Sequence, residues 1–244
     1  MDTVLTLASI RELPDPAGDE ALLALLPPER REKLLRLKRP EDRRRSFGAW
    51  FLLRAALKEL GAEPGPLAYG PQGKPFFPDR PDLHFNLSHS GETVLCALSP
   101  SPVGCDAETI SSAQPELAAR FFHPAEREIL ASLPEAEAAA GFARLWTLKE
   151  SYLKATGAGL SRPLNSFCVD LRPEPPQLRE TEDAARWRFL SILEDGCACA
   201  LCCAADAEPQ LRRAVLRVRD AAHVQMHNPP ELRSGNLVKE SSLL

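Results

Sequence analysis

The chain has 244 residues, of which 44% are hydrophobic and 26% are charged, and its formal net charge is −4. This size and composition predict a globular protein with one large domain or two small lobes. No stretch approaches the roughly 18 uninterrupted apolar residues of a membrane-spanning helix, and the first 15 residues lack the pattern of a secretory signal. We therefore expect a cytoplasmic protein without a membrane partner.

Two helices, interrupted by Pro40, are expected between Pro27 and Gly61. Apolar residues recur along one side of the second helix, so this side should pack on another part of the protein. Arg45 and Arg54 should project from this packed helix. The apolar residues are Phe47, Trp50, Phe51 and Leu57.

Positive charge is concentrated in this region. Between Glu29 and Lys58, eleven Lys and Arg residues stand against four Asp and Glu residues. Such a segment suits a polyanion or an acidic partner, and it can also be simply a solvated helix face. It lacks interleaved aromatic residues and a docking motif, and the whole chain is acidic, so nucleic acid is not an expected partner.

A strand with alternating apolar residues is expected from Leu83 to Ser88, and a tight turn follows at Ser90-Gly91-Glu92. The stretches TVLCALS and PVGCDAE should then form further strands. The first half of the chain is thus helices followed by a small antiparallel sheet.

The second half repeats that order of elements. FHPAEREILASL and AAAGFARLWTLKESYLKATGAG are typical of helices, and FCVDL, RWRFLSILEDGCACALCCAA and RAVLRVRD are typical of strands, with a hairpin at Asp195-Gly196. This predicts an α+β fold with two similar lobes related by a pseudo-twofold axis. Each lobe would pack helices on a small antiparallel sheet, and the active site would lie in the cleft between the lobes. The expected boundaries are residues 1–105, 106–222 and a flexible tail at 223–244.

The seven cysteines lie in apolar stretches and are expected to be reduced core residues. Cys199 and Cys202 have the CxxC spacing of a zinc or redox pair. An alternating strand would send them to opposite faces, which favours the core interpretation.

Acidic residues at two places can meet around a cation. Asp106 and Glu108 are two apart on an expected strand, which puts both carboxylates on one face. Trp146, Glu150 and Lys154 follow at i, i+4 and i+8 on an expected helix and project from one side of it. Each pair alone is also common on protein surfaces. Together they supply hard oxygen ligands for a divalent cation, with a lysine beside them.

A third group of polar residues stands at the end of the first expected sheet. Ser88-His89-Ser90 precedes the turn, and Lys74 lies in the preceding Gly-Lys-Pro loop. A serine hydrolase would also need an orienting acid and an oxyanion hole, and neither can be placed here.

The ordered set GKP, FNLSHS, VGCDAE and WTLKESYLKATG resembles the 4′-phosphopantetheinyl transferases of the two-lobed, surfactin-synthetase-activating type. The resemblance runs from about Pro28 to Asp220. It implies a Mg²⁺-dependent transfer of phosphopantetheine from coenzyme A to a serine of an apo acyl or peptidyl carrier protein, with release of adenosine 3′,5′-bisphosphate.

The same resemblance implies roles for single residues. Magnesium would be held by Asp106, Glu108 and Glu150. The catalytic residues would be Glu150, Lys154 and Asp106. Glu150 or a metal-held water would be the base that takes the serine proton, and Lys154 would offset the negative charge on the leaving group. Coenzyme A would be contacted by Arg30, Lys33, Arg45, Lys74, Ser88, His89 and Lys154.

The expected partners are acidic carrier proteins, steered by the basic segment. Phe121 and Phe122 are either core residues or an apolar contact for the carrier. Two lobes in one chain make a monomer sufficient. The alternative to an enzyme is a module of the same fold that binds coenzyme A or a carrier without catalysis. The acids and lysines of every motif are intact, which argues against this alternative.

Overall fold

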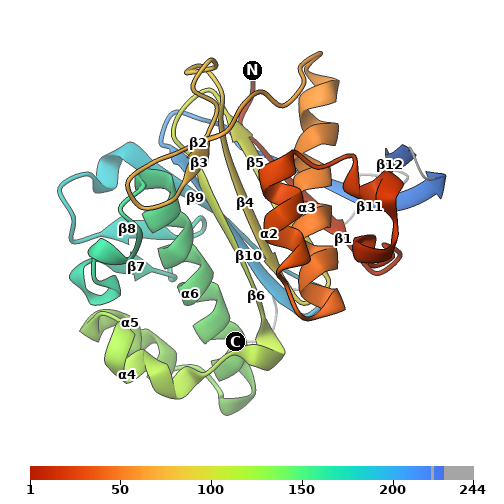
Figure 1. Cartoon of the computed structure of the whole chain (residues 1–244). Helices are drawn as coiled ribbons and strands as arrows, with labels where there is room; N and C mark the ends of the chain where they lie inside the picture. Colours follow the sequence, from red (N-terminus) through yellow and green to blue (C-terminus); the bar gives the residue numbers. More distant parts are fainter. Residues whose placement is uncertain (221–222, 228–244) are drawn as a thin grey trace, which may run out of the picture.

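The structure is a computed structural model, and it describes residues 1–220 and 223–227. Two sheets form its centre, with the order β12-β11-β1-β5-β4 in the first and β6-β10-β9 in the second. Helices pack on both, which confirms the expected α+β class (Figure 1). The strands of the first sheet are β1 (Val4–Ser9), β4 (His84–Ser90), β5 (Thr93–Ser99), β11 (Gln210–Asp220) and β12 (His223–His227), and those of the second are β6 (Gly104–Thr109), β9 (Trp187–Glu194) and β10 (Cys197–Ala204).

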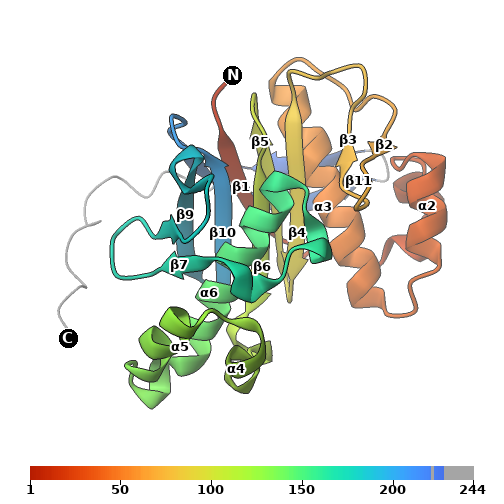
Figure 2. The same ribbon diagram turned by 90° about the vertical axis from the view of Figure 1, so that its left-hand side faces the viewer.

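Two long helices, α3 and α6, and several shorter elements complete the described part of the chain. Figures 1 and 2 show α2 and α3 on one side of the central strands and α6 on the other. No helix in the described part of the chain has both the length and the apolar character needed to span a bilayer. The helices are α1 (Glu20–Leu23), α2 (Pro28–Leu35), α3 (Pro40–Glu59), α4 (Ala118–Phe121), α5 (Pro124–Ala131) and α6 (Glu135–Thr156). The short strands are β2 (Ala68–Tyr69), β3 (Pro75–Phe76), β7 (Cys168–Asp170) and β8 (Gln177–Arg179). Single turns of 3₁₀ helix lie at Pro16–Gly18, Ile110–Ser112, Pro115–Leu117, Gly159–Ser161, Leu164–Ser166 and Ala184–Arg186.

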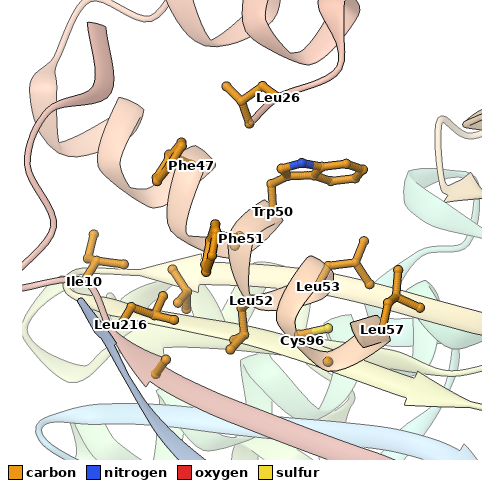
Figure 3. Packing of buried hydrophobic residues seen from close by; sticks show 14 of the residues in the cluster. Ile10, Leu26, Phe47, Trp50, Phe51, Leu52, Leu53, Leu57, Cys96 and Leu216 are labelled. Carbon is orange, nitrogen blue, oxygen red and sulfur yellow. The ribbon is translucent and has the colours of Figure 1, made fainter. Parts of the chain in front are cut away.

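Helix α3 begins where the sequence predicts. Pro40 stands at its first position, where the backbone nitrogen has no partner inside the helix and proline is favoured. Glu41 and Asp42 lie in its first turn, where negative charges interact well with the helix dipole. Its apolar side packs on β4 and β5 (Figure 3). Each large apolar side chain buried there contributes on the order of 1.5–3 kcal/mol. The predicted stripe of Phe47, Trp50, Phe51 and Leu57 is buried.

Both predicted hairpin turns are present. Gly91 between β4 and β5 has a φ of 55°. Asp195 and Gly196 between β9 and β10 have φ values of 50° and 70°, as a type I′ turn requires at both central residues.

A separate apolar cluster fills the space between the two sheets. It contains Leu5 and Leu95 of the first sheet with Cys105 and Cys199 of the second. Cys202 belongs instead to the cluster under α6, so the two members of the CxxC lie on opposite faces of β10, as predicted. All seven cysteines are free and buried, which fits their interpretation as core residues.

The strands of the two predicted lobes are not confined to separate sheets. Strand β6 itself spans the predicted boundary between residues 105 and 106. Strand β11, from the second half, pairs in parallel with β1, with Val4 opposite Gln210, and so completes the first sheet. Strand β12 occupies residues 223–227 of the predicted tail, and residues 228–244 lie outside the described residues.

Gly104 at the start of β6 allows α6 to approach closely. A Cβ at this position would lie 2.1 Å from the carbonyl oxygen of Ser151 and 2.4 Å from the backbone nitrogen of Ala155. Both are backbone atoms of a packed helix and cannot move alone. The absence of a side chain at Gly104 therefore brings α6 against the strand that carries Asp106.

We predict that Gly104→Ala destabilises the fold by about 1–3 kcal/mol or more, because the methyl group must push α6 away from β6. Denaturant unfolding measures the change. Gly18→Ala is the matched control, since nothing lies within 4 Å of a Cβ there. Equal unfolding midpoints for the two variants would contradict the close packing.

Candidate functional site

The two acids of β6 lie on the face that the strand period predicts. Cys105 and Ala107 point into the cluster between the sheets, so Asp106 and Glu108 point away from it. Asp106 is buried and Glu108 is half-buried. The hydroxyl of Ser112, just after the strand, donates to Oε1 of Glu108.

The polar residues of α6 meet this strand at Lys154. Its Nζ lies 2.5 Å from Oδ1 of Asp106 and also donates to the carbonyl of Cys105 at 3.2 Å and to Oγ of Ser88 at 3.3 Å. Ser88 Oγ donates in turn to Oδ1 of Asp106 at 2.8 Å. Segments that are far apart in the sequence, β4, β6 and α6, are thus joined at one ammonium group.

Electrostatics couple Glu150 to the same point. Burial raises the pKa of the Glu150 carboxyl, and repulsion from Asp106 raises it further. Attraction to Lys154 lowers this pKa, but by less, so the net shift is upward. For Lys154 burial lowers the pKa, but Asp106, Cys105 and Glu150 outweigh it and the net shift is upward. The charge of Glu150 therefore interacts with those of Asp106 and Lys154, and the lysine stays charged.

The chemistry of these groups fits a hard divalent cation. Carboxylate oxygens are the ligands that Mg²⁺ prefers, and a cation would relieve the repulsion between Asp106 and Glu150. The hydrogen bonds from Ser88 and Lys154 to the Asp106 carboxylate both end at Oδ1, so Oδ2 takes part in neither. Over residues 1–220 and 223–227, the ligand atoms of Asp106, Glu108 and Glu150 do not form a set lying wholly within 4.8 Å. The fit thus rests on the type of donor and on charge.

A pocket of about 530 Å³ opens beside this point. Its walls come from α2, α3, the β2–β3 loop and β4, and Lys154 reaches it from α6. Five of the residues predicted to contact coenzyme A line it, namely Arg30, Lys33, Ser88, His89 and Lys154.

Two of the predicted contact residues lie beside the pocket and do not line it. The ammonium of Lys74 donates to the carbonyls of Val103 and Ala155, at 2.9 and 3.3 Å, and so ties its loop to the start of β6 and the end of α6. Burial lowers the pKa of Lys74 to about 8. Arg45 donates to the carbonyl of Gly91 at 3.0 Å and pairs with Asp42 at 2.5 Å.

Arg30 is held against the aromatic ring of a core residue. Its guanidinium lies 4.6 Å from the ring centroid of Trp50, at cation–π distance. Burial lowers the pKa of Arg30, and its Nε is buried without a hydrogen-bond partner among the described residues. The side chain of His89 is exposed, and partial desolvation of its ring together with the nearby charge of Arg45 lowers its pKa. These groups favour an anionic ligand that supplies the missing acceptors.

Comparison with known proteins identifies the family of this chain. The sequence model of the 4′-phosphopantetheinyl transferase superfamily matches residues 102–202, which include both acidic motifs. A 4′-phosphopantetheinyl transferase of Bacillus subtilis is 40% identical over 162 residues, covering 65% of this chain and 72% of that protein. The transferase Sfp of Bacillus subtilis (strain 168) is 35% identical over 191 residues, or 76% of this chain and 85% of that protein. HetI of a Nostoc species is 40% identical over 172 residues, or 66% and 71%.

The chain belongs to the 4′-phosphopantetheinyl transferase superfamily. The resemblance drawn from its motifs is thereby confirmed, and the chain is a transferase enzyme of this class. In this transferase, the motif residue Lys149 has a place that sequence reasoning did not assign. It is fully buried, and its Nζ lies 2.5 Å from Oε1 of Glu126 and 2.8 Å from the carbonyl of Phe167. The pair joins α6 to α5, so Lys149 has a structural role, one position before the predicted metal ligand Glu150.

Phe121 and Phe122, each expected to be either a core residue or a carrier contact, differ in the structure. Phe122 is 2% exposed and stacks on Phe142, with ring centroids 5.0 Å apart, so it is a core residue. Phe121 is half-buried and meets the edge of Trp146 at 6.0 Å. Trp146 thus belongs to an aromatic cluster under α6, one turn before Glu150.

Another set of potential metal ligands lies elsewhere in the transferase. His123, Cys168 and Glu180 offer atoms that all lie within 4.8 Å of one another. Nδ1 of His123 accepts the N–H of Ala125, so the proton of a neutral ring is on Nε2, which lies 3.0 Å from Glu180. In this arrangement no lone pair of the ring is available to an ion, and it is the contact of Nδ1 with the Ala125 N–H that caps α5.

We predict that Lys149→Met lowers the free energy of unfolding by about 3–5 kcal/mol, because it leaves Glu126 as an unpaired buried charge. Denaturant unfolding tests this. The double variant Glu126→Gln with Lys149→Met should be more stable than the single one, since the stranded charge is gone. A loss below about 1 kcal/mol in Lys149→Met would contradict the buried pair.

A second prediction concerns pH and uses metal-free protein. Since folding raises the pKa of Glu150, the folded state binds this proton more tightly, and stability falls as pH rises from the ordinary glutamate value through the folded one. Glu150→Gln should therefore stabilise the metal-free protein at neutral pH, and the difference should vanish in acid. Urea unfolding in EDTA across pH measures this, with Glu128→Gln, on the exposed side of α5, as control. A destabilised Glu150→Gln variant at pH 7 would refute it.

Proposed function

We propose that this transferase moves the 4′-phosphopantetheine group of coenzyme A to a serine of an apo acyl or peptidyl carrier protein and releases adenosine 3′,5′-bisphosphate. One observation carries the proposal. Lys154 lines the pocket with the basic residues and at the same time touches Asp106. An anionic ligand in the pocket would therefore reach the acids of β6 and α6 through its own phosphates.

The pocket suits the nucleotide end of coenzyme A. Arg30, Lys33 and His89 surround a space of about 530 Å³, enough for much of a nucleotide. The buried, unpaired Nε of Arg30 favours a phosphate oxygen as its acceptor. We assign the 3′-phosphate to Arg30 and Lys33, with Arg45 beside them. Lys74 would hold the loop that flanks the nucleotide, through its two carbonyl contacts.

The relative placement of the parts supports a site between two similar lobes. Residues 1–105 would contribute the basic helices, and residues 106–222 the acids and Lys154. Each part has a long helix on strands, α3 on β4 and β5 and α6 on β6 and β10. A pseudo-twofold relation between them and a cleft for coenzyme A are part of the proposal.

Asp106, Glu108 and Glu150 would hold Mg²⁺ together with the diphosphate of coenzyme A. When bound there, the ion would supply Lewis acidity and offset negative charge on the phosphate oxygens. The protein's own contribution is placement. Gly104 brings α6 to β6, and Lys154 keeps Asp106 oriented.

The reaction then follows from the residues around the diphosphate. The serine oxygen of the carrier forms a bond to the β-phosphorus as the bond between that phosphorus and the bridging oxygen breaks. The serine proton passes to Glu150 or to a water beside it, and a positioned base of this kind contributes on the order of 10² to 10⁴ in rate. The ammonium of Lys154 stabilises the charge on the departing adenosine 3′,5′-bisphosphate.

The carrier would approach from the basic side of the molecule. Acidic carriers are attracted by the excess of Lys and Arg between Glu29 and Lys58. Phe121 is the remaining candidate for an apolar contact, since Phe122 is in the core. A cytoplasmic monomer would be sufficient for this activity. The runner-up is a module that binds coenzyme A without transfer, and the assay below separates the two.

We predict that incubation with coenzyme A, Mg²⁺ and apo carrier increases the carrier's mass by one phosphopantetheinyl group. Asp106→Asn and Glu150→Gln should lower the rate by at least about 10²-fold, because each removes a charge that acts in the transition state. Intact-protein mass spectrometry measures the product, and EDTA should stop the reaction. Binding of coenzyme A without any mass gain, across several carriers, would favour the binding module.

Arg30 tests the nucleotide assignment separately. Loss of one charge-assisted hydrogen bond costs about 1.5–3 kcal/mol, so Arg30→Ala should raise KM for coenzyme A roughly 10- to 100-fold with a smaller change in kcat. The effect should shrink with 3′-dephospho-coenzyme A, which lacks the phosphate in question. Arg31→Ala, on the same helix but paired with Glu20, is the control. Equal losses with both substrates would remove Arg30 from the 3′-phosphate.

A further inference from the structure

Strands β4 and β6 belong to different sheets, yet they are joined by a regular set of hydrogen bonds. Three side-chain oxygens of β4 accept three backbone N–H groups of β6. Asn86 Oδ1 accepts from Cys105 at 2.8 Å, Ser88 Oγ from Ala107 at 3.2 Å, and Ser90 Oγ from Thr109 at 3.0 Å. In every case the two residues are 19 apart. We call this set the side-chain ladder.

The ladder follows from strand geometry. Alternate residues of a strand direct their N–H groups to the same edge and their side chains to the same face. On one edge β6 is paired with β10, and on the other its amides need acceptors because buried N–H groups are costly when unsatisfied. The alternation N-x-S-x-S in FNLSHS supplies three acceptors at the required spacing.

The ladder determines where the acids lie relative to the pocket. Asp106 and Glu108 alternate with the three bonded residues of β6, so any slip of β6 along β4 moves both carboxylates. Asn86, Ser88 and His89, which line the pocket, are on β4 itself. The distance between the basic pocket and the acids is thus fixed by contacts between these two strands.

The end of the ladder also reaches a predicted metal ligand. Ser90 Oγ lies 3.3 Å from Oγ1 of Thr109, which lies 2.6 Å from Oγ of Ser112. The Ser112 hydroxyl donates to Glu108. A change at Ser90 is therefore passed to Glu108 through two hydroxyl groups.

We propose that Asn86 and Ser90 are positioning residues of the transferase, which hold the acids of β6 in register with the phosphate-binding residues of β4. The inference rests on the proposed function. It assigns to the FNLSHS motif a task beyond ligand contact, because Ser90 does not line the pocket and acts only through β6. Misplacement of reacting groups by about 1 Å can cost about 10²-fold in rate, so the ladder has kinetic consequences.

Ser90→Ala is the decisive variant, with Ser90→Thr as its matched control, since threonine keeps the hydroxyl acceptor. Ser166→Ala, at an exposed turn, controls for loss of any serine. In hydrogen–deuterium exchange, the peptide covering residues 104–109 should exchange about 10-fold faster in Ser90→Ala, because an amide loses its acceptor. The peptide covering residues 44–54 of α3 should be unchanged.

Kinetics separate a positioning role from a merely structural one. In Ser90→Ala, kcat should fall about 10- to 100-fold and the Mg²⁺ concentration for half-maximal rate should rise, while adenosine 3′,5′-bisphosphate without metal binds as in the wild type. Ser90→Thr should restore both values. Faster exchange in β6 with unchanged kcat and Mg²⁺ dependence would overturn the proposal, as would unchanged exchange. An inactive wild-type protein would instead refute the proposed function.

Discussion

The site depends on the contact between the ammonium of Lys154 and the carboxylate of Asp106, with the hydroxyl of Ser88 bonded to both. This contact joins a helix and two strands that come from different parts of the chain. It forms because Gly104 lets α6 approach β6 at backbone distance. A side chain at Gly104 would separate the partners without changing any polar residue. The close packing at Gly104 thus brings the Lys154 ammonium next to the Asp106 carboxylate.

Charges of opposite sign are divided between the two sides of the molecule. The N-terminal helices present Arg30 and Lys33 to the pocket, beside Glu29 and Asp42, whereas Asp106, Glu108 and Glu150 lie on β6 and α6. A diphosphate ligand with a divalent cation would satisfy both sides, since the basic groups attract its oxygens and the acids attract the cation. The side-chain ladder between β4 and β6 keeps the two sets in register. The distance between the basic residues of the pocket and the acids is thus held by a few hydrogen bonds, and Lys154 belongs to both groups.

Much of this arrangement follows from local sequence patterns. The proline-bounded helices, the Asp195-Gly196 turn and the alternation of Asp106 and Glu108 with Cys105 are all consequences of short-range geometry, and the structure has them. The parallel pairing of β1 with β11 was missed because it joins residues about 200 apart and has no local signature. Lys149 and Glu150 are neighbours in one motif, yet Lys149 is buried against Glu126 of α5, whereas the pKa of Glu150 is raised in part by repulsion from Asp106. Likewise, Lys74 has a charge that suits a phosphate, but the structure directs it to two carbonyls. The spacing of Asn86, Ser88 and Ser90 was the one readable signal of the ladder.

We propose that carboxylates of β6 and α6 hold a divalent ion on the diphosphate of coenzyme A. To test this, Mg²⁺ is replaced by Mn²⁺ and ³¹P hyperfine coupling is measured by electron–nuclear double resonance, with coenzyme A bound to the protein. The account predicts phosphorus coupling to a protein-held ion in the wild type, and loss of the held ion in both Asp106→Asn and Glu150→Gln. Unchanged Mn²⁺ binding and coupling in these two variants would contradict it.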